Sequence, residues 1–158
     1  MKKFRSSRGW RNNNPLNIRR GENWVGLVEK PTDRQFCQFI SMAMGYRAAY
    51  LVLKSYYRYF NQKGMVCSIE NIIKRWAPPK ENDTEGYICR VEGMLCFGRE
   101  MPIYPGLSAV QDERVGRLMA AMTCVECGCE PNDLDYYPIA RGILMAGGRL
   151  VNVDSLRL

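Results

Sequence analysis

The chain has 158 residues, of which 46% are hydrophobic and 25% charged, a composition that fits one globular domain and excludes disordered and fibrous proteins. No apolar stretch approaches the roughly 18 residues of a membrane span, so we expect no membrane insertion. Seven basic side chains and no acid lie in residues 1–20, whereas the remaining residues carry sixteen charges of each sign. The net charge of +7 therefore predicts a basic N-terminal arm, residues 1–10, on a single domain over 11–158.

The segment that follows the arm, residues 8–34, is polar and rich in turn-forming residues. Its short extended pieces are expected over 16–19 and 24–29, where they would be joined through Gly21 in a hairpin-like turn. From residue 41 onward, apolar residues recur at helical spacing. Helices are expected at 41–62, at 69–76 after the N-cap Ser68, from Asp83 or Thr84 to near Gly98, from the Ser108–Gln111 capping box to Gly128, and at 138–146. The predicted fold is α+β, mostly α, with a small β element near the N-terminus.

The basic arm has no apolar stretch after its charges, so we expect a protein that is made in the cytoplasm without a signal peptide. Such an arm is either a solvated tail or a contact for nucleic acid, an acidic polymer or an anionic membrane surface. Only Phe4 and Trp10 of the arm could stack on bases, so nucleic acid is the least favoured of these partners.

The chain contains seven cysteines and no histidine, which excludes Ser-His-Asp and Cys-His catalysis. Any acid–base chemistry must come from carboxylates, Lys, Tyr or Cys. The cluster Cys124–Cys129 contains one C-x-x-C, but a structural zinc site usually needs a second pair or histidines at ligand spacing. We therefore expect reduced, mostly buried thiols, no metal and no cofactor.

Several short motifs occur in a fixed order along the first half of the chain. They are Arg11–Arg19 with its Asn-Asn-x-x-x-Ile, Trp24-Val25-Gly26, Thr32–Phe36 with Phe39, Gly45–Ala48, and Arg75–Pro79 with Glu81–Thr84 and Tyr87. Together they resemble the lysozyme-like structural proteins of phage virions and prophages, some of which are lytic transglycosylases. The Asn-rich motif and its downstream Trp-x-Gly also resemble the core of flagellar-type glucosaminidases. The resemblance covers about residues 8–92.

This resemblance implies a lysozyme-like domain that cleaves the bond between N-acetylmuramic acid and N-acetylglucosamine in peptidoglycan glycan strands. One Glu would be the essential acid, and a transglycosylase needs no second carboxylate because a hydroxyl of the sugar captures the glycosyl centre. The protein would act at the cell wall or in a virion, with other virion proteins as further partners. The alternative is a non-catalytic virion structural or cell-wall-binding protein on the same fold.

The position of the catalytic Glu departs from the glucosaminidase pattern, in which a helix ending in Glu precedes the Asn-rich motif. Only eleven residues precede Asn12, and none is acidic. Residues 118–128 resemble the apolar helix that ends in Glu-x-Gly, which makes Glu126 the lead candidate in a circularly permuted arrangement. Its apolar neighbours would favour a protonated carboxyl, although Glu126 could equally begin a solvated helix end. The alternative acids are Glu22, Asp33 and Glu81. Each also fits a structural role: Glu22 lies in a solvated turn, Asp33 could cap or stabilise a turn, and Glu81 could cap a helix.

Sugar binding would require aromatic platforms and amide side chains. Trp24, Trp76 and Tyr87 could stack on pyranose faces, although the last two also fit a helical core. Candidates for pairing with N-acetyl groups are Asn13, Asn14 and Asn82.

Overall fold

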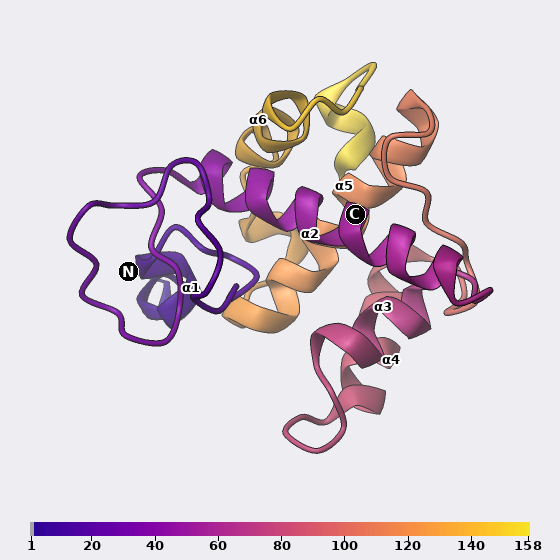
Figure 1. Ribbon diagram of the computed structural model, residues 1–158, viewed down its shortest axis with the longest axis horizontal. Helices are drawn as coiled ribbons and strands as arrows, with labels where there is room; N and C mark the ends of the chain where they lie inside the picture. Colours follow the sequence, from indigo (N-terminus) through magenta and orange to yellow (C-terminus); the bar gives the residue numbers. More distant parts are fainter. Residues whose placement is uncertain (1) are drawn as a thin grey trace.

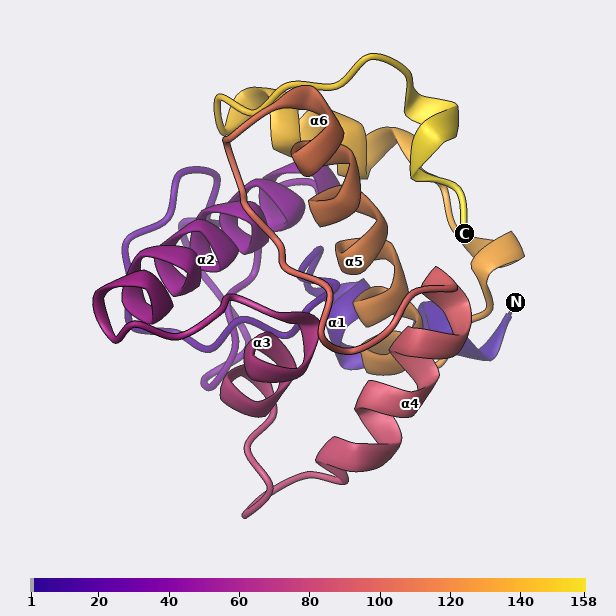
Figure 2. The ribbon, with the colours of Figure 1, turned by 90° about the vertical axis from the view of Figure 1, so that its right-hand side faces the viewer.

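Two long helices, α2 (Met42–Gln62) and α5 (Ala109–Cys127), form the centre of the molecule in the computed structural model, which describes residues 2–158. Figure 2 shows α5 between α2 and α4, with α6 across one end. The remaining elements are η1 (Lys3–Ser6), α1 (Arg8–Arg11), α3 (Ile69–Trp76), α4 (Thr84–Leu95), η2 (Pro131–Asp133), α6 (Tyr137–Met145) and η3 (Val153–Leu156). The prediction of a mostly helical fold is confirmed.

Helix α5 is the core helix. It contacts α1, α2, α4, α6 and η3, and every residue from Leu118 to Cys124 is buried. A helix that is surrounded on all sides must be apolar around its whole circumference, which explains the run of Met, Ala, Thr and Cys. The last turn of α5 reaches the surface, so a polar residue there lies at the boundary between core and solvent.

The helix ends follow the capping chemistry of the sequence. The side chains of Ser68, Asp83 and Ser108 each accept a backbone N–H from the first turn of the helix that follows, as N-caps do. Helix α5 ends at Gly128, whose φ of 69° is the left-handed conformation that glycine adopts without steric cost. Helix α4 ends earlier than predicted, because Cys96 takes the left-handed conformation before Gly98 is reached.

The predicted hairpin between residues 16–19 and 24–29 is not confirmed. Both pieces pair instead with residues 35–40, through the isolated antiparallel bridges Arg19↔Phe36 and Leu27↔Phe39. Within the described residues no longer strand forms at this end of the chain. Residues 12–40 therefore make an irregular loop, which Figure 1 shows projecting beside the start of α2. Left-handed backbone at Asn17 and Gly26 interrupts the extended pieces.

The described part of the basic arm is folded against the domain. Phe4 is 5% exposed and packs edge-to-face on Trp10, with ring centroids 4.9 Å apart. Lys2 pairs with Asp133, and Arg8 pairs with Asp33. The arm therefore fixes its apolar side in the core while most of its cationic side chains face solvent. None of the helices in residues 2–158 has the length and apolar character needed to cross a membrane.

Candidate functional site

Glu126 lies in the last turn of α5, where α3, α4 and the irregular loop converge. Its Oε2 accepts a hydrogen bond from Asn17 Nδ2 at 2.9 Å, and its Oε1 accepts one from the Tyr87 hydroxyl at 3.2 Å. The indole N–H of Trp76 donates to the Leu16 carbonyl at 3.3 Å and lies close enough to Glu126 to favour its charged form. Three elements far apart in the sequence therefore hold one half-buried carboxyl.

The environment of Glu126 favours the protonated carboxyl. Burial raises the pKa of Glu126 above the ordinary glutamate value, and the hydrogen bonds from Asn17 and Tyr87, together with the nearby indole N–H of Trp76, oppose only part of that rise. A carboxyl that keeps its proton to higher pH than an ordinary glutamate is better suited to donate it to a leaving group. The site therefore has the electrostatic character of a general acid.

A groove passes Glu126 on both sides. One hollow of about 590 Å³ is lined by Tyr87, Asn82 and Glu126, and a second of about 570 Å³ is lined by Trp76, Asn82 and Glu126. A third hollow, of about 240 Å³, continues from the second because it shares Asn17 and Trp76. Because neighbouring hollows share lining residues, they form an extended surface that suits a chain-like ligand better than a compact one.

Four of the candidate residues from the sequence lie at this groove beside Glu126. Trp76 and the exposed Asn82 line it, where they can contact a ligand. Tyr87 is 7% exposed, so its ring belongs to the core and its hydroxyl serves Glu126. Glu81 is exposed and lies 3.6 Å from Arg19 in an ion pair at the edge of the same hollow.

Asn13 and Asn14 build the loop instead of lining the groove. Asn14 is fully buried, and its amide bonds the backbone of Ile18 and Cys37. Asn13 has left-handed backbone and donates to the Phe39 carbonyl at 3.0 Å. Trp24 is half-buried, packs against the core and lines neither of the larger hollows that contain Glu126.

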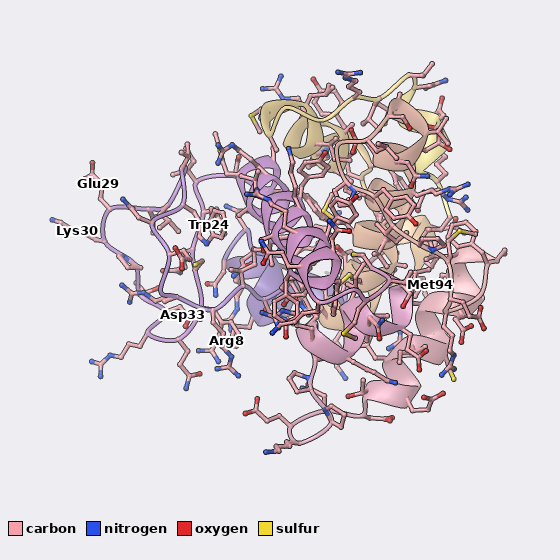
Figure 3. The ribbon with its side chains drawn as sticks, turned by 45° about the vertical axis from the view of Figure 1, so that its right-hand side comes forward. Arg8, Trp24, Glu29, Lys30, Asp33 and Met94 are labelled. Atoms are coloured by element: carbon pink, nitrogen blue, oxygen red, sulfur yellow. The ribbon has the colours of Figure 1, made fainter. Side chains whose placement is uncertain are left out.

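Asp33 ties the loop to the arm. Arg8 donates to both of its carboxylate oxygens, at 2.6 and 2.8 Å, and Asn12 donates to Oδ2 at 2.8 Å. This guanidinium and the backbone N–H groups of Gln35 and Phe36 hold the pKa of Asp33 far below its usual range. Figure 3 shows Arg8 and Asp33 near each other at the base of the loop, with Glu29 and Lys30 at its tip. Asp33 is thus an anion held in place by its donors.

Glu22 is exposed and lines a separate hollow of about 410 Å³, enclosed by the loop together with Arg20 and Glu29. It contributes to neither of the larger hollows beside Glu126. The thiols of Cys124, Cys127 and Cys129 are buried and free, and no group of three or more possible metal ligands occurs in residues 2–158.

Sequence reasoning missed Asn17, which supplies the hydrogen bond to Glu126. The available signal was weak: Asn tolerates the left-handed conformation more readily than most residues, and Asn17 has a φ of 52°. That backbone geometry places the amide at the end of α5.

A scan against models of known protein families finds no match. The chain is 36% identical over 134 residues to Protein P5 of Pseudoalteromonas phage PM2. The aligned region covers 82% of this chain and 77% of the phage protein. At this identity and coverage, the chain belongs to the same family as the phage protein P5.

Proposed function

We propose that this protein cleaves peptidoglycan glycan strands, with Glu126 as the general acid. The observation that carries the proposal is the half-buried carboxyl of Glu126, which has a raised pKa and lines an extended groove. The chain belongs to a family with a phage protein, and a phage must pass the bacterial wall. This membership therefore supports a role in opening the wall. The protein would act at the cell wall or as part of a virion, in contact with other virion proteins.

In the proposed reaction, protonated Glu126 donates its proton to the glycosidic oxygen, and the bond from that oxygen to the sugar C1 breaks. A water, or the C6 hydroxyl of the same sugar, then attacks C1 and gives its proton to the Glu126 carboxylate. The first route is hydrolysis and the second is transglycosylation. Glu126 returns to its protonated state in either case, so no cofactor is consumed.

The proposed architecture is lysozyme-like with a permuted order of elements. The helix that ends in Glu126 follows the Asn-rich segment in the sequence, yet the hydrogen bond from Asn17 sets the two side by side. Trp76 would serve as a platform for a sugar ring, and Asn82 would pair with an N-acetyl group.

The decisive variant is Glu126→Gln, which keeps the size of the side chain but cannot donate an acidic proton. We expect turnover of purified murein to fall by about a hundredfold or more, with binding nearly unchanged. Glu81→Gln and Glu22→Gln are the matched controls and should retain most of the activity. Mass spectrometry of the products separates the routes, because only transglycosylation leaves anhydro ends. Full activity of the Glu126 variant would refute the assignment.

A second candidate function is binding of cell wall or virion components without cleavage. It is favoured by the occupation of both Glu126 oxygens by internal donors, a pattern that a purely structural carboxyl also has. Retained murein binding by the wild type, together with no cleavage of any murein tested, would establish this second function.

A further inference from the structure

A basic hollow, of about 610 Å³, lies on the arm side of the loop. Three arginines line it, Arg8, Arg11 and Arg34, together with the amides of Asn12 and Gln38. Asp33 is its one acidic lining residue. The hollow is therefore a concave surface with an excess of positive charge.

Only one of the three arginines is neutralised. Arg8 is paired with Asp33, whose side chain is 8% exposed. Arg11 and Arg34 are exposed, and among residues 2–158 neither has a carboxylate within ion-pair distance. Two guanidinium groups are thus free to bind an anion, and guanidinium geometry matches a carboxylate in a bidentate manner.

The floor of the hollow is held in place by internal contacts. Asn12 donates to Asp33, and Gln38 donates to Asn12 at 3.0 Å. Arg8 also donates to Gln35 at 3.1 Å. Because these polar groups already bond one another, an anion that binds at Arg11 and Arg34 needs little reorganisation of the loop.

The basic hollow adjoins the groove through a single aromatic ring. The Phe36 ring contacts two guanidinium groups, with Arg8 4.4 Å and Arg19 5.2 Å from its centroid. Phe36 and Arg19 line the hollow that also contains Glu126. A polymer seated beside Glu126 therefore passes close to the arginines, and its side groups can reach them.

We propose that the basic hollow binds the carboxylates of peptide side chains carried by the glycan strand. This inference rests on the proposed function, because it assumes that a glycan lies in the groove. It selects peptide-bearing strands over stripped ones. Duplex or single-stranded nucleic acid is the less suitable ligand, since no aromatic side chain of residues 2–158 lines the basic hollow for a base to stack on.

The test is a binding measurement with soluble murein strands that carry their peptides and with the same strands after an amidase has removed them. Glu126→Gln protein serves as the binding reagent, so that cleavage does not alter the ligand. We expect peptide-bearing strands to bind about tenfold more tightly, and Arg11→Ala/Arg34→Ala to abolish that preference. The preference should also weaken as salt is added.

The matched control is Arg58→Ala/Arg141→Ala, which removes the same charge from exposed positions on α2 and α6 and should keep the preference. Circular dichroism and melting temperature establish that both double variants are folded. Equal binding of both strands by the Glu126→Gln protein overturns this inference while leaving the proposed function intact. Binding of neither strand overturns both. Tighter binding of DNA than of either strand, lost in Arg11→Ala/Arg34→Ala, overturns the inference in favour of nucleic acid.

Discussion

Helix α5 carries one carboxyl side chain near each end, buried in the first turn and half-buried in the last, and the two have different surroundings. Asp112, in the first turn, is 1% exposed and accepts from the Tyr50 hydroxyl at 2.7 Å and from the N–H groups of Gly106 and Arg149, both at 2.8 Å. Glu126, in the last turn, has two side-chain donors and borders a groove. The same chemical group thus serves two purposes on one helix.

The difference follows from the number of donors and the direction of the helix. Three donors, together with the positive end of the helix dipole, suit Asp112 to be an anion. That anion joins α2, the turn before α5 and the segment after α6. Glu126 lies at the negative end of the same dipole, where a carboxylate is disfavoured. The comparison teaches that α5 is anchored at its first turn and is available for chemistry at its last.

The largest effect should come from removing the anchor. Asp112→Ala leaves the buried Tyr50 hydroxyl and the part-buried N–H groups of Gly106 and Arg149 without their acceptor, so we expect the free energy of unfolding to fall by about 3–5 kcal/mol. Urea denaturation measures this loss. Glu113→Ala, the next residue of α5, is the control and should change stability by no more than about 0.5 kcal/mol. A loss of similar size in both variants would contradict the role of Asp112.

A smaller effect is expected on the pH dependence of the proposed activity. Only protonated Glu126 can donate, so the wild-type rate should fall as pH rises through its raised pKa. Tyr87→Phe and Asn17→Gly each remove a donor that favours the charged form, and therefore raise this pKa and shift the alkaline limb to higher pH. Glycine at position 17 tolerates the left-handed backbone. At the acid plateau the rate should fall by about fivefold or less, as for one hydrogen bond. If the alkaline limb of the pH–rate profile does not shift in these variants, the group that titrates is not Glu126.

The smallest effect should be on the stability of Glu126→Gln. A raised carboxyl pKa means that the native state is favoured while Glu126 is protonated and loses that advantage as pH rises and the buried group ionises. The Gln variant should therefore gain melting temperature relative to the wild type as pH rises above the ordinary glutamate pKa. Thermal melts over a pH series measure the difference. A variant that becomes relatively less stable toward neutral pH would show that Glu126 is held as an anion.

The helices were predictable because their signals are local. Ser68, Asp83, Ser108 and Gly128 mark helix ends through contacts with residues only a few positions away. The buried run before Glu126 identified an apolar helix that ends in an acid, which the structure places at the groove with Trp76. Local periodicity and capping chemistry were sufficient for this part of the fold.

The loop was not predictable because its contacts are long-range. Asn13 and Asn14 were expected to bind sugar, yet their amides donate to the backbone carbonyls of Phe39 and Cys37, more than twenty residues further along the loop. The ion pair of Arg8 with Asp33 and the position of Asn17 depend on left-handed turns in the loop. A short stretch of sequence does not show in which direction such turns send the chain. Residue type indicated polar chemistry in this segment, but not which partner each side chain would find.

The hydrogen bond from Asn17 to Glu126 joins residues that are 109 positions apart in the chain. A nascent chain on the ribosome carries the loop long before it carries the end of α5, so the proton donor is assembled only when most of the protein has been synthesised. A single proteolytic cut between the two would leave neither fragment with a complete groove. Recovery of the groove would then depend on reassociation of the fragments, which is a second-order process governed by their concentration.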